Sequence, residues 1–391
     1  MLSIAPNRLN AIYHRIRKKI VSLVKRNDFL LKTESLYHFK SNILLNIEKA
    51  DIFISVGPAI FSETKRQVEV ALPPLNLYLF ENSIVNSRSS CIVYKNQLVK
   101  EYFNLSERFN VGFIKTHTDS TALIKRYEVV RISEGLFLGG NGSWNWYHWI
   151  IEILPRTLLL NHIKTKTLLV SDDLLKYSSM LNTLKAVVGD SFHLVFMSSK
   201  KNYLVKKLYY VNGISYMPFN LPNNTAFQLK DSFIRSNILI KLRNTLVLQF
   251  AQEEPLEKIE KIFLYRATHR TSKNQDHLLH EMQKEGFKSV NFDGLTVQEQ
   301  IHYMQSAKVV MGITGAAFTN LIFANPGTKF ICLMQKGMED VSCFSNLANI
   351  FDIDLYYHFY TSNMLHDEHY SSDFELNIVE IVSLYKRIIH G

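Results

Sequence analysis

The sequence of 391 residues is poor in cysteine, with Cys91, Cys332 and Cys343 and no Cys-x-x-Cys pair. Such a sparse, odd-numbered set argues against a disulfide framework or a zinc site and favours a reducing compartment. No run of 18 or more apolar residues occurs, so we expect no transmembrane helix. The first residues also lack the apolar core and small-residue cleavage site of a signal peptide. These absences predict a cytoplasmic protein.

Negative charge is also in short supply, since 45 Lys and Arg outnumber 35 Asp and Glu and give a formal net charge of +10. Much of the excess lies in the first 26 residues, where basic side chains are interleaved with apolar ones. This pattern fits a basic helix on the inner face of an anionic membrane, and it equally fits a solvated helix packed on the protein. No recognised nucleic-acid-binding motif accompanies the charge, so we expect no nucleic-acid partner. We predict a basic helical arm over residues 1–40.

Apolar segments typical of strands become regular after residue 135, at 135–138, 167–170, 192–196, 262–265, 288–292, 309–311 and 329–333. Segments typical of helices lie between or after them, at 144–161, 174–188, 277–285, 297–307, 316–324 and 374–389. Strands that alternate with helices indicate a parallel sheet. We place a junction in the polar stretch 220–258. The sequence thus predicts an α/β protein with domains over 41–240 and 241–391.

A Gly-flanked turn joins the strand at 309–311 to the following helix, and it contains Gly312, Thr314, Gly315 and Ala316. A helix start offers free backbone N–H groups and the positive end of the helix dipole, which suit a diphosphate. Small residues allow that group to approach the backbone closely. The pattern is neither Gly-x-Gly-x-x-Gly nor a Walker loop, so an ordinary tight strand–helix turn is the alternative interpretation.

Two arginines, Arg266 and Arg270, follow the strand at 262–265. The carboxyl end of a strand is the usual ligand edge of a parallel sheet. A guanidinium suits phosphate because it is always charged and can bind bidentately. The alternative is a basic loop paired with nearby carboxylates. We expect this loop and the Gly315 turn to lie at the same edge of the sheet.

The tryptophans of the chain all lie within six residues, at Trp144, Trp146 and Trp149. On a helix, Asn145, His148 and Glu152 share a face with an edge of Trp149. Glu152 lies one turn after His148, where it can orient the imidazole and raise its basicity, as a general base requires. A structural histidine–carboxylate hydrogen bond within a core is the alternative.

Three blocks resemble glycosyltransferase family 61 in order and spacing over about residues 135–335. Residues 145–149 and 154–156 are similar to its Asn-x-x-His-Trp and Leu-Pro-Arg motifs. Arg266, Arg270 and Asn274 are similar to its Arg-x-x-x-Arg-x-x-x-Asn loop. Residues 299–301 and 312–327 are similar to its Glu-Gln-Ile … Gly-x-x-Gly-Ala-x-x-Thr-Asn … Pro-Gly run. One departure is Thr314, where many relatives have histidine, so a charge-assisted phosphate contact is lost.

The resemblance implies a GT-B fold, in which two Rossmann-like domains face each other across a cleft. It implies an inverting glycosyltransferase that needs no metal and no other cofactor. A nucleotide-sugar donor, expected to be a UDP-sugar, would contact Arg266, Arg270, Asn274, Thr314, Gly315, Ala316 and Asn320. An oligosaccharide or lipid-linked glycan acceptor would contact Asn145, Trp146 and Trp149. His148 would be the base, oriented by Glu152. Bacterial relatives imply a role in capsule or surface polysaccharide synthesis.

Two other functions stay open at this point. A non-catalytic carbohydrate-binding or scaffold protein of a polysaccharide assembly would fit a donor site that is degenerate at Thr314. A metal-dependent GT-A transferase would use the Asp352-Ile353-Asp354 triplet to hold Mn²⁺ or Mg²⁺, as Asp-x-Asp motifs do. Apolar neighbours at Phe351 and Leu355 favour a strand end or turn for that triplet.

Overall fold

The computed structural model describes residues 28–101, 113–117, 120–218, 227–251, 257–268, 270–361 and 374–390. The basic segment within residues 1–26 lies outside these ranges, and its interpretation stays a prediction. The last part of the predicted helical arm is wrong, because Asp28–Ser35 is strand β1. Leu31 of this strand is buried in a small core with Ile124. Packing against neighbouring strands therefore decides the conformation here.

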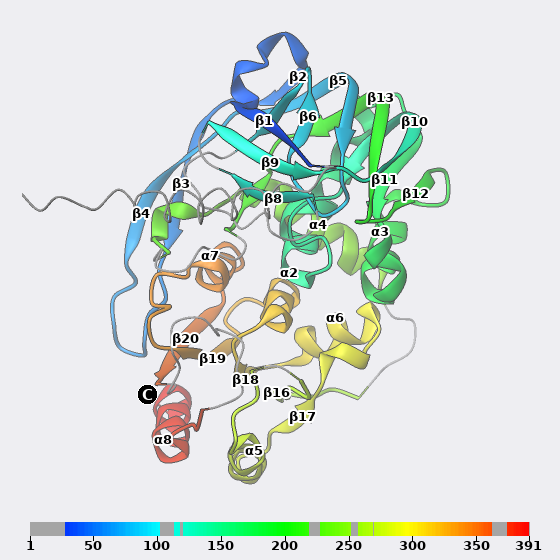
Figure 1. Ribbon diagram of the computed structural model, residues 1–391. Helices are drawn as coiled ribbons and strands as arrows, with labels where there is room; N and C mark the ends of the chain where they lie inside the picture. Colours follow the sequence, from blue (N-terminus) through cyan, green and yellow to red (C-terminus); the bar gives the residue numbers. More distant parts are fainter. Residues whose placement is uncertain are drawn as a thin grey trace, which may run out of the picture.

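A mixed sheet of 11 strands forms the upper part of the molecule (Figure 1). It contains β1, β2 (Ile43–Glu48), β5 (Leu75–Val85), β6 (Ile92–Tyr94), β7 (Gln97–Lys100), β8 (Ile114–His117), β9 (Thr121–Lys125), β10 (Glu128–Leu138), β11 (Thr167–Ser171), β12 (His193–Met197) and β13 (Lys201–Val211). Their order is β12-β11-β10-β13-β5-β6-β7-β1-β9-β8, and β2 pairs with β5. The neighbours β12, β11, β10 and β13 are mutually parallel, whereas β5 lies antiparallel to β13.

The segment predicted as a helix over 144–161 is helical for most of its length but changes type twice. It begins as α2 (Trp146–His148), continues as the π-helical η3 (Trp149–Ile153), and ends as the 3₁₀-helical η4 (Leu154–His162). Pro155 lacks the N–H that an α-helical ladder would need at this point. Single π turns are frequent at functional sites, which draws attention to this segment. The later helices of this half are η5 (Asp172–Lys176), α3 (Ser178–Val188) and α4 (Ser236–Gln249).

The second sheet has five parallel strands and lies in the lower part of Figure 1. Its order is β17 (Lys288–Val290), β16 (Lys261–Leu264), β18 (Val309–Ile313), β19 (Lys329–Gln335) and β20 (Asp354–Tyr360). Its helices are α5 (Gln275–Lys284), the 3₁₀-helical η7 (Phe292–Gly294), α6 (Val297–Ser306), the 3₁₀-helical η8 (Ala316–Phe323), α7 (Cys343–Ile350) and α8 (Ile378–His390). All five residues of β18 are buried, as in parallel strands covered on both faces. The strands and helices predicted between residues 262 and 333 are confirmed.

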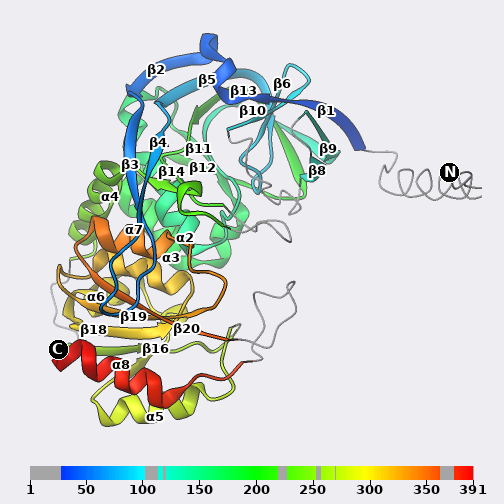
Figure 2. The ribbon, with the colours of Figure 1, turned by 90° about the vertical axis from the view of Figure 1, so that its left-hand side faces the viewer.

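A hairpin and a shared hydrophobic core connect the two sheets. The hairpin consists of β3 (Asp51–Val56) and β4 (Gln67–Leu72), and Figure 2 shows it running from the first sheet down along the second. Beyond β3, the carbonyl of Ala59 accepts a hydrogen bond of 3.0 Å from the N–H of Tyr357 in β20. One hydrophobic cluster includes Trp149 from the first half and Phe318 from the second. The halves are thus packed directly on each other.

The structure confirms a mixed α/β protein with a large sheet and helices. Two Rossmann-like domains facing across a cleft, with a boundary at residue 240, stay a prediction, whereas the boundary at residue 40 is wrong because β1 belongs to the first sheet. The three cysteines are buried and free, as the sparse set suggested. None of the described helices has the length and apolarity needed to cross a bilayer.

Candidate active site

The first candidate site lies at the carboxyl ends of β16 and β18. Numbered along the chain, the second sheet has the order 2-1-3-4-5, and β16 and β18 are its strands 1 and 3. In such doubly wound sheets, ligands bind where the strand order reverses, which is between these two strands. Arg266 follows β16, and its Nη1 donates a hydrogen bond of 2.6 Å to the carbonyl of Thr314, which follows β18. The expectation that the arginine loop and the glycine turn share one edge is therefore confirmed.

Gly315 makes this approach of Arg266 sterically feasible. A Cβ at position 315 would lie 2.0 Å from Arg266 Nη1, far inside van der Waals contact. The φ of Gly315 is 169°, an extended conformation that any residue adopts, so space is the constraint at this position. Gly315 is also the N-cap of η8, whose first backbone N–H groups have no partner within the helix. Donor groups of the backbone and a guanidinium therefore meet at one turn.

The electrostatics of this turn favour an anion. Burial and the neighbouring charge of Arg270 lower the pKa of Arg266 to about 10, while Asp293 acts in the opposite direction. Arg266 still carries its charge at neutral pH, and its hydrogen bond goes to a backbone carbonyl. A half-buried cation beside a second cation is stabilised by a bound anion, and a diphosphate would bring that charge.

Three other side chains that were predicted to contact the nucleotide-sugar donor form hydrogen bonds within the protein. The side-chain amide of Asn274 donates to the carbonyl of Leu376 and accepts from its N–H, each at 2.9 Å. The amide of Asn320 donates to the carbonyl of Ala317 at 3.2 Å, and its oxygen accepts from an indole. Thr314 is buried, with its hydroxyl beside the Cys332 thiol. These hydrogen bonds give all three side chains structural partners, and their contacts with a donor stay a prediction.

The second candidate site is the helical segment after β10. Asn145 caps α2, because its Oδ1 accepts from the N–H of Tyr147 at 2.9 Å. Trp149 is fully buried, and its Nε1 donates to Thr183 Oγ1 at 3.0 Å. The expectation that Trp149 borders the acceptor cleft is therefore wrong, since this side chain belongs to the core. Trp146 is half-buried, so it lies nearer the surface than Trp149 does.

His148 and Glu152 lie together, as their spacing predicted. The ring Nδ1 of His148 lies 3.1 Å from Glu152 Oε1, and the two side chains are 8% and 12% exposed. The same carboxylate oxygen accepts a hydrogen bond of 2.9 Å from the N–H of Met217. The Met217 hydrogen bond fixes the position of the carboxylate, and the His148 ring lies within ion-pair distance of it. This arrangement fits a general base that a carboxylate holds in place, and it equally fits a histidine–carboxylate pair with a structural role.

Gly142 provides the space for the His148 ring, which gives a direct prediction. A Cβ at position 142 would lie 2.6 Å from His148 Cγ and Cδ2, and the φ of Gly142 is +75°. We expect Gly142→Ala to displace the ring and to lower any turnover that depends on His148 by about 100-fold, a loss that a misplacement of about 1 Å can cause. Gly189→Ala is the control, because Gly189 has φ +68° with nothing within 4 Å of its added Cβ. Equal losses of turnover in the two variants would contradict the prediction.

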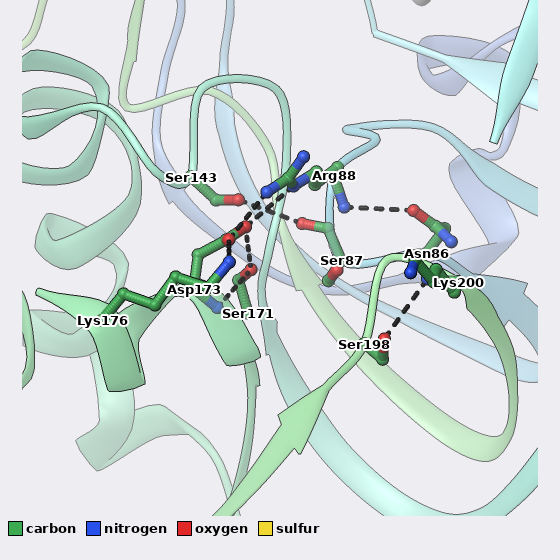
Figure 3. A network of polar contacts seen from close by, with 9 residues as sticks. All are labelled: Asn86, Ser87, Arg88, Ser143, Ser171, Asp173, Lys176, Ser198 and Lys200. Atoms are coloured by element: carbon green, nitrogen blue, oxygen red, sulfur yellow. Dashed lines mark hydrogen bonds and ion pairs between the residues drawn. The ribbon is translucent and has the colours of Figure 1, made fainter. Parts of the chain in front are cut away.

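Motif reasoning missed a polar network that holds the glycine-rich loop before α2 (Figure 3). Arg88 donates to both carboxylate oxygens of Asp173, at 2.8 and 2.7 Å, and its guanidinium lies 4.6 Å from the centre of the Trp144 ring. Burial opposes the charge of Asp173, but hydrogen bonds from Arg88 and Lys176 outweigh it and keep the pKa of Asp173 below its usual value. Nothing local in the sequence indicates a contact between residues 88 and 173.

The Asp352-x-Asp354 triplet lies at the opposite edge of the second sheet from Arg266. The carbonyl of Asp352 accepts a hydrogen bond from the N–H of Gly327, and the N–H of Asp354 donates one to the carbonyl of Thr328. Gly327 and Thr328 lie just before β19, and Asp354 is the first residue of β20. Asp352 has φ 56°, which confirms the expected turn. Within the described ranges, no group of three or more His, Cys, Asp or Glu side chains is arranged to hold a metal ion. The triplet therefore lies away from both candidate sites.

Residues 146–331 match the model of the family described as Glycosyltransferase 61. This range contains His148, Glu152, the arginine loop and the Gly315 turn, and it confirms the resemblance carried by those residues. The matched segment belongs to the Glycosyltransferase 61 family, and this family indicates a glycosyltransferase. No curated protein matches the chain.

Proposed function

We propose that the chain is an inverting glycosyltransferase that transfers a sugar from a nucleotide-sugar, a UDP-sugar in the first instance, to a glycan acceptor. The observation that carries this proposal is the packing of Arg266 against the Gly315 turn where the strand order reverses. In the reaction, the bond from the anomeric carbon to the diphosphate breaks while the bond to an acceptor oxygen forms. The family relation supports the transferase class.

Each half of the site has a separate part in this reaction. Arg266, Arg270 and the start of η8 would stabilise the negative charge that develops on the departing diphosphate, a task for which preorganised donors are most effective. His148 would take the proton of the acceptor hydroxyl at Nε2, while Glu152 holds Nδ1. Because attack and departure take place on opposite faces of the sugar, a single displacement inverts the anomeric carbon. The two guanidinium groups and the start of η8 supply positive charge that would allow catalysis without a metal.

The acceptor side and the biological setting are also part of the proposal. An oligosaccharide or lipid-linked glycan would approach along α2, and capsule or surface polysaccharide synthesis in the cytoplasm at a membrane is the setting that bacterial relatives favour. A non-catalytic carbohydrate-binding protein is the second candidate. The observation in its favour is Thr314, whose buried hydroxyl lies beside Cys332 and not at the anion site.

A thermal-shift screen with UDP, GDP, CMP, ADP and TDP tests the proposal. A ligand at 100 times its Kd stabilises a folded protein by about 2.7 kcal/mol, so one nucleotide should raise the melting temperature clearly. We expect UDP to do so and EDTA to leave the shift unchanged. Failure of all five nucleotides would favour the binding-protein alternative, and loss of the shift in EDTA would contradict the metal-independent mechanism.

A further inference from the structure

Two residues expected to contact different substrates instead contact each other. Trp146, predicted on the acceptor side, donates from Nε1 to the side-chain oxygen of Asn320, predicted on the donor side, at 3.1 Å. Asn320 is 1% exposed, so its oxygen has little access to water and depends on the indole for a partner. This hydrogen bond joins side chains that are 174 positions apart in the sequence.

The position of this bond connects the two halves of the site. Trp146 lies two residues before His148 on the same helical segment, and Asn320 lies within η8, five residues after Gly315. The Asn320 amide also donates to the carbonyl of Ala317, which fixes its orientation. A shift of η8 would therefore be passed to the segment that carries His148 through this directional contact as well as through the packing of α2 against η8.

We propose that Trp146 and Asn320 are positioning residues, whose hydrogen bond sets the distance between the base His148 and the donor diphosphate held at Gly315. This role rests on the proposed function. Neither side chain touches the reacting atoms, so the effect of losing the bond falls on the alignment of the two substrates. Misplacement by about 1 Å can reduce the rate 100-fold without a change in donor affinity.

The test uses Trp146→Phe, which removes the indole N–H and keeps an aromatic ring. Trp149→Phe is the matched control, because it removes an equivalent indole hydrogen bond, to Thr183, that lies within the first half alone. UDP affinity is measured by calorimetry, and turnover by release of UDP from UDP-GlcNAc. We expect Trp146→Phe to lower kcat by about 10- to 100-fold with unchanged UDP affinity, and Trp149→Phe to retain most of its turnover. Equal losses of kcat in both variants, or a parallel loss of UDP affinity, would overturn the proposal.

A double-mutant cycle separates the bond from the proposed function. In the first cycle, melting temperatures are compared for Trp146→Phe, Asn320→Ala and the variant that carries both substitutions. The control cycle is the same, except that Trp149→Phe replaces Trp146→Phe. We expect the first cycle to be non-additive and the control cycle to be additive, because the Trp146 indole donates to Asn320 whereas the Trp149 indole donates to Thr183. Additivity in the first cycle would refute the bond itself. The first cycle could be non-additive while the wild-type protein neither binds UDP nor turns over UDP-GlcNAc. That combination would refute the proposed function, and the positioning role with it, while the bond itself would stand.

Discussion

Replacing Gly315 by alanine should abolish nucleotide binding while leaving the protein folded. The added Cβ would lie 2.0 Å from Arg266 Nη1, so the guanidinium must leave its position at the Thr314 carbonyl. The φ of 169° accommodates alanine without backbone strain, and the conflict is confined to one side chain. Removal of one preorganised donor from a developing oxyanion typically costs about 10²–10³ in rate. We expect a loss of this order in turnover, together with loss of the melting-temperature shift caused by UDP.

Gly294→Ala provides the control for this experiment. Gly294 lies in the same half, after β17, and nothing lies within 4 Å of the Cβ that alanine would add. This variant should bind UDP as the wild-type protein does. Unchanged UDP binding by a folded Gly315→Ala variant would show that Arg266 is not part of the donor site.

A second comparison shows whether the effect of Gly315→Ala passes through Arg266. Arg266→Ala alone should remove UDP binding to a similar extent, because it deletes the charge that the turn presents. Adding Gly315→Ala to Arg266→Ala should then cost little more, since the side chain that collides with the new Cβ is absent. Independent losses would instead indicate that the backbone of the turn binds the diphosphate in its own right. Arg266→Lys should not restore binding, because an ammonium lacks the fixed fork of a guanidinium.

The meeting of the arginine loop and the Gly315 turn at one sheet edge was predictable because the signals for it are local. A strand such as Val309–Ile313 is apolar at nearly every position, and its neighbours in the sheet follow the same rule. In a parallel sheet, the carboxyl ends of all strands lie at one edge, so residues that directly follow two strands can be brought together without knowledge of side-chain contacts. The capping box of Thr296 and Glu299 was likewise visible, because its hydrogen bonds stay within four residues.

The first half could not be predicted in the same way, because its pairings are non-local. Strand β1 lies between β7 and β9, whose residues follow about 60 to 100 positions later. Which strands pair depends on how side chains pack across the sheet, and a single sequence does not show this. The hydrogen-bond partners of Asn274 and Asn320 within the protein could not be predicted for a related reason. An amide suits a phosphate or a carbonyl equally well, and their partners lie 102 and 174 positions away.

Replacing His148 by glutamine should lower turnover by about 10²–10⁴, the contribution that a positioned general base makes. Glutamine has a similar reach and can still donate to Glu152, so the folded structure should persist. UDP affinity should stay unchanged, because the anion site lies on the other half. His38→Gln is a matched control: His38 forms an i,i+4 pair with Glu34 at 2.6 Å, and its side chain is 73% exposed.

The outcome for Glu152 separates catalysis from structure at this pair. Glu152→Gln retains an oxygen that can accept from Met217 but removes the negative charge beside the imidazole. If His148 is the base, this charge stabilises the imidazolium that forms when the acceptor proton arrives, so turnover should fall while the melting temperature changes little. If the pair is structural, both variants should lower the melting temperature together with turnover. A lowered kcat at constant stability and constant UDP affinity therefore assigns the proton transfer to His148.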